Sequence, residues 1–274
     1  MRKLLATGVL ALPLLAAPAA VFPALAEAGH GPKLLDTRFS FEGPFGTIDR
    51  AAAQRGFQIY KEVCAACHAM SLMSYRNLMD LGLSEAAVKG IAAEVQVEDV
   101  NDVGEKIERP GKPSDRFKKP FPNDAAAAAA NGGAAPPDLS LIIKARPNGA
   151  RYVFSLLQGY VDFDSLTDQQ KAEFGLAKDY KLEEGKHFNI YFQPGEQGYK
   201  IGMAKPLSDG QVNYVDGSKN DLPSMARDVV TFLAWASEPH MEARKRTGVR
   251  VVLFLLIFAG MMYAVKRKIW ADAH

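Results

Sequence analysis

The sequence has 274 residues with 33 basic and 31 acidic side chains, so its formal net charge is only +2 at pH 7. This near balance hides an asymmetry, because residues 27–241 hold 24 basic and 29 acidic side chains, a net charge of −5. An acidic domain suits a basic partner through electrostatic steering, and we expect no nucleic-acid partner. The presence of only two cysteines excludes a zinc site built from two cysteine pairs.

The first 26 residues have the pattern of a secretory signal peptide. Arg2 and Lys3 precede the apolar stretch "LLATGVLALPLLAAPAAVF", and residues 24–26 read Ala-Leu-Ala, which matches an A-x-A cleavage site. We therefore predict that residues 1–26 are removed and that the mature chain begins near Glu27, outside the cytoplasm. The alternative is an uncleaved anchor, which Pro13, Pro18 and Pro23 disfavour.

Both cysteines lie in the segment "YKEVCAACHAM", residues 60–70, as Cys64 and Cys67, and His68 follows directly. The preceding stretch "RAAAQRGFQIYKEV" has apolar residues at helical spacing, which predicts a helix, and Gly56 would let that helix approach another backbone closely.

Covalent attachment of haem is the interpretation that uses all three residues. The two thiols add across the porphyrin vinyl groups, and the imidazole binds the iron. A redox dithiol would leave His68 unexplained and lacks a βαβ context, and half of a zinc site has no second cysteine pair to complete it. We predict one covalently attached haem c, with His68 as an iron ligand.

Acidic residues gather in "EVQVEDVNDVGEKIE", residues 94–108. A solvated face is the ordinary meaning of such a cluster. Further along, Ala125–Ala130 reads as a low-complexity linker that leads into turns at Gly132-Gly133 and Pro136-Pro137, and Asp138 is placed to cap a helix. Arg146 either pairs with a haem propionate or interacts with a helix end at the surface, and the residues alone leave both open.

The second iron ligand must come from elsewhere in the chain. Met203, in the glycine- and proline-flanked loop "GYKIGMAKPL", is the favoured methionine, and His187 is its rival because bis-histidine ligation also occurs. Met225 lies in a helical stretch, "PSMARDVVTFLAWASE", where a buried methionine is usually packing. A thioether ligand would raise the reduction potential.

A second apolar run, Val251–Val265, lies near the C-terminus and extends back to Thr247. At ~1.5 Å per residue, about 19 residues match the ~30 Å of membrane hydrocarbon. Basic residues flank both ends, so the positive-inside count is nearly tied. The signal peptide and the haem instead predict a periplasmic domain at 27–241, an anchor at 242–268 with its span at about 247–265, and a cytoplasmic tail at 269–274.

Several stretches in the right order resemble the cytochrome c1 family, the haem subunit of the cytochrome bc1 complex, in its alphaproteobacterial form. They include "FSFEGPFGTID", "RGFQIYKEVCAACHAM", "SYRNL", "PPDLS", "KARPNGARYVFSLLQGY", "IGMAKPL", "DVVTFLAWASEP" and "ARKRTGVRVVLFLLIF". The segment from Asp164 to Lys200 matches poorly, so the packing of the loop beneath Met203 is not predicted. Some bacterial relatives carry an extra disulfide, for which this chain has no cysteines.

The resemblance implies a mainly α fold, a c-type cytochrome haem domain with long loop insertions plus one C-terminal transmembrane helix. It implies His68 and Met203 as the axial ligands, with Arg146 toward a propionate. The haem-lining positions implied by the motifs are Asn131, Pro136, Pro137, Ile142, Arg146, Tyr152, Leu156, Leu157, Ile201 and Pro206.

The function implied by the resemblance is one-electron transfer, with no bond-making residue in this chain. A Rieske 2Fe–2S protein would deliver the electron, a soluble basic cytochrome c (cytochrome c2-like) would collect it, and cytochrome b would hold the anchor in a dimeric complex in the membrane. One alternative is a membrane-anchored electron-transfer cytochrome of another periplasmic dehydrogenase or oxidase. A different class, a haem sensor or peroxidase, would leave the sixth iron position open.

Overall fold

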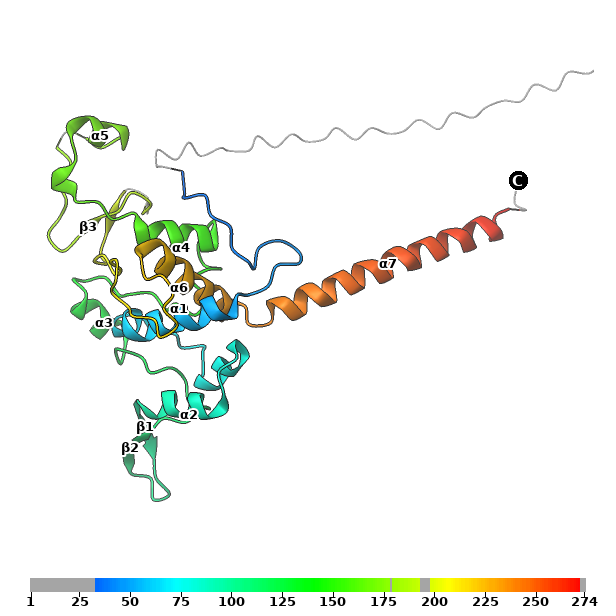
Figure 1. The fold of residues 1–274 in the computed structure, drawn as a ribbon, viewed down its shortest axis with the longest axis horizontal. Coiled ribbons are helices and arrows are strands. Elements are labelled where there is room, and N and C mark those ends of the chain that lie inside the picture. Colours follow the sequence, from blue (N-terminus) through cyan, green and yellow to red (C-terminus); the bar gives the residue numbers. More distant parts are fainter. Residues whose placement is uncertain (1–32, 178, 193–197, 272–274) are drawn as a thin grey trace, which may run out of the picture. The chain divides into compact units, whose positions relative to one another are not determined.

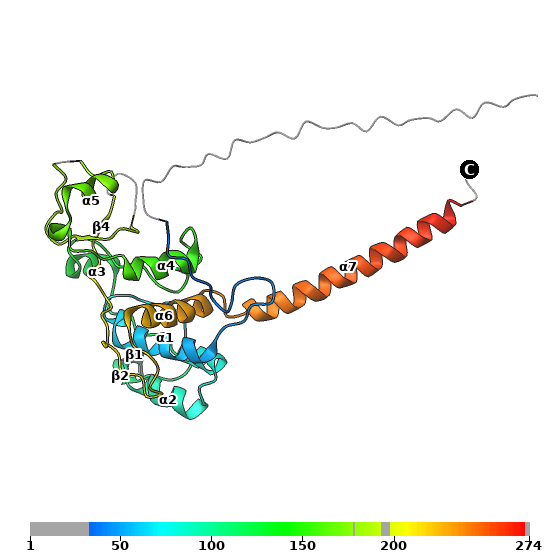
Figure 2. The same ribbon diagram turned by 45° about the horizontal axis from the view of Figure 1, so that its top comes forward.

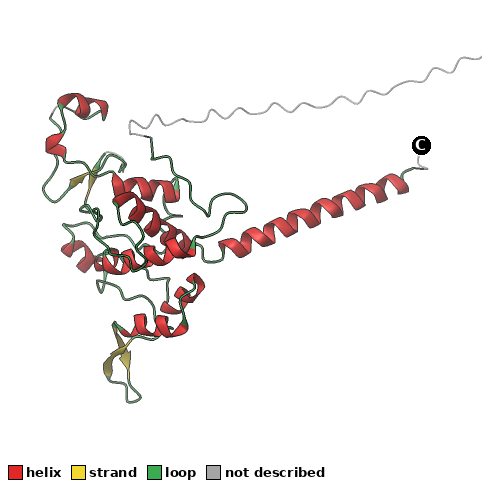
Figure 3. Cartoon of the chain, in the orientation of Figure 1, coloured by secondary structure: helices red, strands yellow, loops and turns green. Residues whose placement is uncertain are grey.

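A computed structural model describes residues 33–177, 179–192 and 198–271. The predicted signal peptide lies outside the described residues. In chain order the helices and strands are α1 (Arg50–Glu62), η1 (Cys64–Ala66), η2 (Tyr75–Leu81), α2 (Glu85–Ala93), β1 (Gln96–Val100), β2 (Lys106–Pro110), α3 (Asp124–Ala130), α4 (Gly149–Gln158), η3 (Phe163–Ser165), α5 (Asp168–Glu173), β3 (His187–Phe188), β4 (Lys200–Ile201), α6 (Leu222–Ser237) and α7 (Met241–Ile269), where η marks a 3₁₀ turn. Helices dominate and the strands are short (Figure 3), which confirms the predicted mainly α class.

The pair α1 and α6 forms the centre of the fold, and the two helices lie side by side in both views (Figures 1 and 2). Helix α1 begins where the Asp49 side chain accepts a hydrogen bond from Ala52 N at 3.0 Å. Gly56 faces α6 so closely that an added Cβ would lie 2.1 Å from the Asp228 carbonyl oxygen. The predicted close approach of another backbone at Gly56 is therefore confirmed.

Aromatic side chains fill the space around this helix pair. The Phe57 ring lies 5.9 Å from that of Phe117 and 5.7 Å from that of Phe232, and the Trp235 ring lies 5.7 Å from that of Phe232. All four are buried. Because each ring removes a large apolar area from water, this cluster holds the end of α1, and with it the cysteine segment, in a fixed position.

The segment from Asp164 to Lys200, whose packing the sequence did not predict, contributes to a small separate core. Leu166, Phe188 and Tyr199 are buried together. The Phe188 ring contacts Phe163 at 5.4 Å and Phe174 at 5.7 Å. The antiparallel pairing of β3 with β4 then connects this core to the loop that carries Met203.

Two local predictions are wrong. Ala125–Ala130 is not a linker but most of helix α3, which the Asn123 side chain caps by accepting a hydrogen bond from Ala126 N at 2.9 Å. Alanine has the highest helix propensity, so a capped alanine run of this kind forms a helix where the surroundings allow. Asp138 caps no helix, because the chain makes turns from there until α4 begins at Gly149.

The acidic segment forms the antiparallel hairpin of β1 and β2, which the sequence did not predict. Glu98 lies opposite Glu108 in the register, and both side chains are exposed. Two like charges directly across a strand pair destabilise it, so this pair is not explained by the stability of the hairpin. The surface that results is acidic, as expected for a solvated face.

Helix α7 begins at Met241 and ends at Ile269, and so extends beyond the predicted span in both directions. It is long and apolar enough to cross a membrane once. Every side chain from Val251 to Val265 is exposed, so nothing in the described part of the chain covers them. An apolar helix that is exposed on all sides fits a lipid environment better than water.

Candidate haem-binding site

The cysteine segment is a tight turn that follows α1 directly. The backbone N–H groups of Cys67 and His68 both donate to the Cys64 carbonyl oxygen, at 3.1 and 2.8 Å. Cys64 is half-buried, Cys67 is exposed, and both are free thiols. The turn therefore presents two thiols and an imidazole from one short stretch of backbone, as the sequence predicted.

The environment of Cys64 makes this thiol a poor nucleophile. Burial, with a smaller contribution from Cys67, raises the pKa of the Cys64 thiol to about 12. Reactive dithiols instead have at least one thiol with a lowered pKa, because the thiolate is the nucleophile. At neutral pH this thiol stays protonated.

The imidazole of His68 is oriented by a backbone carbonyl. Its Nδ1 lies 2.8 Å from the Pro137 carbonyl oxygen. Since that oxygen can only accept, Nδ1 carries the hydrogen and Nε2 keeps a free lone pair. Burial lowers the pKa of His68, although the bond to Pro137 acts in the opposite direction, so the ring is neutral near pH 7. A neutral ring fixed through Nδ1 is how proteins prepare a histidine to bind metal through Nε2.

Residues 69–72 and 138–140 are joined by a set of hydrogen bonds. The backbone N and Oγ of Ser71 donate to Asp138 Oδ2 at 2.8 and 2.6 Å, and Leu139 N donates to the Ala69 carbonyl oxygen at 2.8 Å. Leu72 N donates to Ser140 Oγ at 3.1 Å. This pairing is what brings the Pro136-Pro137 turn to His68, and it is the actual role of Asp138.

Met203 lies in a half-buried loop just after β4. Its carbonyl oxygen accepts a hydrogen bond from the Tyr160 hydroxyl at 3.0 Å, which ties the loop to the end of α4. His187 lies opposite Ile201 in the pairing of β3 with β4, so both candidate ligands belong to the same part of the fold. Met203 remains the predicted second iron ligand.

The burial of the other methionines supports that choice. Met70, Met73 and Met225 belong to the hydrophobic core and are at most 3% exposed. Their thioethers pack against protein on all sides. Among the methionines between α1 and α6, this leaves Met203 and the exposed Met79, and Met79 lies only 11 positions after His68.

The predicted lining residues come from three parts of the chain. Ile142, Leu157 and Ile201 are buried, whereas Asn131, Pro136, Tyr152, Leu156 and Pro206 are half-buried, and Pro137 and Arg146 are exposed. Pro137 is brought to His68 by its carbonyl, and the charge of Arg146 lies near enough to Tyr152 to offset part of the pKa increase that burial causes there. The Asn131 amide donates to the Ala127 carbonyl oxygen at 2.8 Å and so closes α3.

The chemistry of this set fits a c-type haem. The set offers two thiols for thioether bonds, a neutral imidazole with a free Nε2, a thioether in a half-buried loop and several apolar side chains. Arg146 makes no salt bridge within the described residues; the one hydrogen bond from its side chain goes to the neighbouring Ala145 carbonyl. Its charge is therefore free to pair with an anionic group.

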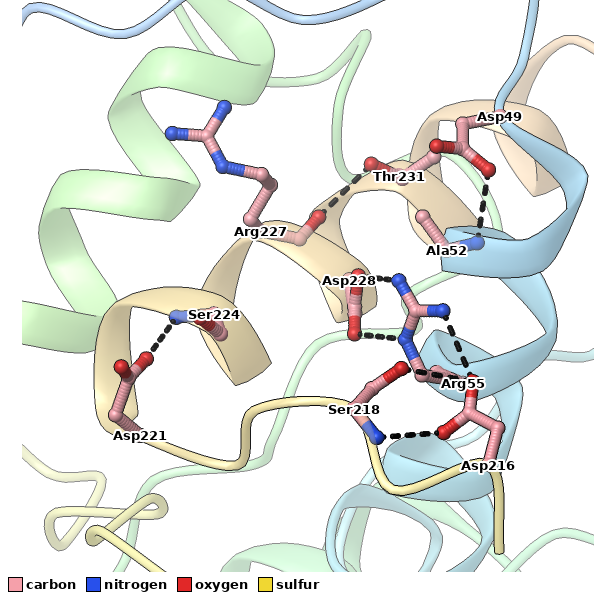
Figure 4. A network of polar contacts seen from close by, with 10 residues as sticks. All are labelled: Asp49, Ala52, Arg55, Asp216, Ser218, Asp221, Ser224, Arg227, Asp228 and Thr231. Carbon is pink, nitrogen blue, oxygen red and sulfur yellow. Dashed lines mark hydrogen bonds and ion pairs between the residues drawn. The ribbon is translucent and has the colours of Figure 1, made fainter. Parts of the chain in front are cut away.

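Sequence reasoning missed two features that position the Met203 loop. Tyr160 is one, although it closes a stretch, "KARPNGARYVFSLLQGY", whose pattern is distinctive. The second is the polar network around Arg55 shown in Figure 4, in which Asp228 is buried and Asp216 is exposed. The Arg55 guanidinium donates to Asp228 at 2.7 and 3.0 Å and to Asp216 at 3.3 Å.

This network links three segments of the fold. Arg55 lies on α1, Asp228 on α6, and Asp216 on the stretch that follows Met203 (Figure 4). Gln58, one turn after Arg55, donates to the Asn213 carbonyl oxygen at 3.0 Å. Burial raises the pKa of Asp228 and the bonds from Arg55 lower it in part. Nothing in the sequence alone pairs an arginine with carboxylates more than 160 positions away.

A mainly helical domain that carries two thiols and a metal-ready imidazole on one turn, and ends in an apolar helix long enough to cross a membrane, defines a class of protein, the membrane-anchored c-type cytochromes. A family model described as "Cytochrome C1 family" matches residues 39–273. The chain therefore belongs to the cytochrome c1 family, as its motifs predicted.

The chain is also similar to several proteins that are named as cytochromes c1. The chain is 47% identical over 247 residues to "Cytochrome b/c1" of Bradyrhizobium diazoefficiens, an alignment that covers 86% of this chain and 35% of that protein. It is 46% identical over 241 residues to "Cytochrome c1" of Rhodospirillum rubrum, covering 85% and 86% of the two chains. It is also 46% identical over 244 residues to "Cytochrome c1-2, heme protein, mitochondrial" of Solanum tuberosum, covering 89% and 87%. The function of the chain is electron transfer as a cytochrome c1, with haem as its cofactor.

Proposed function

We propose that this chain carries single electrons from a Rieske 2Fe–2S protein to a soluble basic cytochrome c, as the cytochrome c1 subunit of a quinol–cytochrome c oxidoreductase. The observation that carries the proposal is the His68 ring, which is fixed through Nδ1 to the Pro137 carbonyl oxygen and lies on the same turn as Cys64 and Cys67. That arrangement has no evident use other than holding haem.

Each residue then has a distinct task. Cys64 and Cys67 would hold the haem through thioether bonds, and His68 and Met203 would bind its iron. When bound, the haem supplies an iron centre that gains and loses one electron. With two protein ligands, the iron would have no position left for a small-molecule ligand, which separates an electron carrier from a sensor or peroxidase.

The surrounding side chains exclude water and fix the charge of the group. Pro136, Ile142, Leu156, Leu157, Ile201 and Pro206 give the haem an apolar environment, and Asn131, Pro137 and Tyr152 complete the lining. Arg146 would pair with a propionate, because it makes no salt bridge within the described residues and the one hydrogen bond from its side chain goes to the Ala145 carbonyl oxygen.

The topology of the proposal follows the charge and the anchor. Residues 1–26 direct export, residues 27–241 form the periplasmic haem domain, residues 242–268 form the anchor beside cytochrome b, and residues 269–274 lie in the cytoplasm. The complex is a dimer. The acidic charge of the domain favours a basic, cytochrome c2-like acceptor and disfavours nucleic acid.

Purification in mild detergent through a C-terminal tag on this chain tests the proposal. We expect a b-type cytochrome and a 2Fe–2S protein to elute together with the chain, and the complex to reduce cytochrome c with quinol as donor. Co-elution with a different dehydrogenase or an oxidase, without these two proteins, would instead support the membrane-anchored alternative. A His68→Ala variant carried through the same steps controls for subunits that merely stick to the detergent micelle.

A further inference from the structure

A hollow of about 370 Å³ lies where the haem domain meets the start of α7. One wall is the turn of residues 44–47, and the other is formed by the first turns of α7. Its lining includes Phe45, Glu242, Lys245, Arg246, Val249 and Arg250. None of these residues takes part in the haem site described above.

The two walls are fixed to each other by polar contacts. The Lys245 ammonium donates to the carbonyl oxygens of Phe41 and Gly46, at 2.6 and 3.1 Å. Glu242 accepts from Ile48 N at 2.9 Å and forms an ion pair with Arg50 at 3.1 Å. Both of these charges are satisfied within the protein, so they hold the hollow open without being available to a ligand.

Two other cations of the hollow are available. The side chains of Arg246 and Arg250 make no hydrogen bond or ion pair in the part of the chain that the structure describes, and both are exposed. They are four positions apart on α7, so they share one face and lie about 6 Å apart along the helix axis. The nearest carboxylate in the lining, Glu242, is already paired with Arg50.

The apolar part of the hollow consists of the exposed Phe45 and the half-buried Val249. Phe45 is 79% exposed at the tip of the turn, and Val249 lies between the two arginines on α7. An aromatic ring in that position has no protein to pack against in the described residues. The unbroken apolar stretch of α7 starts at Val251, so Phe45 and the two arginines lie beside the boundary between lipid headgroups and hydrocarbon.

We propose that this hollow binds an anionic phospholipid. The phosphate lies between Arg246 and Arg250, and an acyl chain runs past Val249 and Phe45 into the hydrocarbon. The site matches both parts of this ligand, since the guanidinium groups bind the phosphate and the apolar side chains contact the acyl chain. A soluble phosphate would use only the arginines and leave the exposed Phe45 unexplained.

Native mass spectrometry of the tagged chain, purified in detergent with its co-purifying subunits, measures this binding. Phosphatidylglycerol and phosphatidylcholine with identical acyl chains are the two probes. We expect wild type to prefer phosphatidylglycerol, and Arg246→Gln and Arg250→Gln each to weaken its binding about fivefold, as expected for one basic residue near an anionic headgroup. Phosphatidylcholine binding should change little in these variants.

Two further variants sharpen the result. Arg244→Gln removes the same charge from the same helix, but Arg244 pairs with Glu238 and does not line the hollow, so it should leave the preference unchanged. Phe45→Ser should weaken both lipids alike, because it removes apolar contact and no charge. Inorganic phosphate should compete poorly with the lipid, because it can contact the arginines but not the apolar side chains.

The proposal is overturned if the double variant R246Q/R250Q keeps the wild-type preference for phosphatidylglycerol. It is also overturned if R244Q weakens phosphatidylglycerol binding as much as R246Q or R250Q does. It is equally overturned if Phe45→Ser releases a protein subunit and leaves lipid binding intact, since the occupant would then be a protein segment. These outcomes are independent of the haem and of the electron donor, so failure here leaves the proposed function standing.

Discussion

The two proposed iron ligands differ in how firmly the protein holds them. The His68 ring is fixed by the bond between its Nδ1 and the Pro137 carbonyl oxygen, at 2.8 Å. Met203 lies on a loop and is held only through its backbone, where its carbonyl oxygen accepts from the Tyr160 hydroxyl at 3.0 Å. A ligand on a loop can be exchanged without disturbing the core, which makes Met203 the residue where the assignment is most cleanly tested.

We expect Met203→Leu to lower the reduction potential by on the order of 0.1 V or more, because a thioether ligand raises it, and to let carbon monoxide bind the reduced haem. Redox titration and the Soret spectrum under carbon monoxide measure both effects. Met79→Leu, at an exposed methionine outside the core, is the matched control and should change neither. If the reduced haem of Met203→Leu still fails to bind carbon monoxide while that of His187→Ala binds it, the second ligand is His187 instead.

Asp138 gives a pH-dependent contribution to stability. Burial raises its pKa, but the hydrogen bonds from Ser140 and Ser71 outweigh this and lower the pKa below its usual value. A carboxyl whose pKa is lower in the folded state stabilises the fold above its unfolded pKa of about 4, and this contribution is lost as the pH falls through the lower folded value.

Asp138→Asn should therefore destabilise the holo-chain by about 1 kcal/mol at pH 7, a modest figure because the side chain is partly solvated. The difference from wild type should shrink as the pH falls below about 4. Urea unfolding at pH 7 and pH 3.5, followed through the haem absorption, measures it. The exposed Asp102→Asn serves as the control and should show a small effect at both pH values. A difference that stays constant with pH would contradict the assigned role.

At the scale of elements, the contact between α1 and α6 depends on Gly56. An alanine Cβ there would lie 2.1 Å from the Asp228 carbonyl oxygen and 2.7 Å from Phe232 Cβ. The helices would have to separate, at a cost of about 1–3 kcal/mol for overpacking, which exceeds the gain of about 1 kcal/mol in helix propensity.

Gly56→Ala should thus lower the free energy of unfolding, and Gly90→Ala in α2 should raise it by about 0.5–1 kcal/mol, since a Cβ at Gly90 meets nothing within 4 Å. The same substitution has opposite signs at two helical glycines, so a general effect of alanine cannot imitate the result. Denaturant unfolding of the two variants side by side measures the signs, and an unchanged stability for Gly56→Ala would show that α6 can move away.

The elements also show where sequence reasoning succeeds. The apolar spacing of residues 50–63 predicts helix α1, and the glycine inside it predicts the close contact; the Asp49 cap, which the spacing does not reveal, adds a second local signal. The alanine run was misread as a linker although Asn123 was in place to cap it, because composition was weighed above propensity.

Long-range contacts were the part that local patterns did not contain. Asp138 looked like a helix cap because aspartate favours that position, but its partner Ser71 lies 67 positions earlier. Tyr160 and the Arg55 network likewise act on residues far away in the chain. The two strands of the acidic hairpin were missed because their charged side chains hide the alternation that marks a strand.

At the scale of the whole molecule, the two signs of charge are separated along the chain. The domain of residues 27–241 has an excess of acidic side chains, 29 against 24 basic ones, whereas seven basic residues flank the apolar part of α7, where they suit lipid headgroups. A +2 chain is therefore acidic toward a soluble partner and basic toward the membrane. The exposed pair of Glu98 and Glu108 is unfavourable for its own hairpin, but it adds to the negative charge that the domain presents to a soluble partner.

This separation predicts a strong effect of salt on electron transfer to a soluble acceptor. Exposed charges are screened beyond about 10 Å at 0.1 M ionic strength, so the second-order rate of reduction of a basic cytochrome c should fall steeply between 10 and about 300 mM salt. Stopped-flow reduction of the acceptor by the pre-reduced complex measures this rate, and an acidic cytochrome c of similar potential provides the matched control. The rate with the acidic acceptor should rise as salt screens repulsion. A flat profile with both acceptors would mean that the net charge of −5 plays no part in docking, and that contacts at close range select the partner.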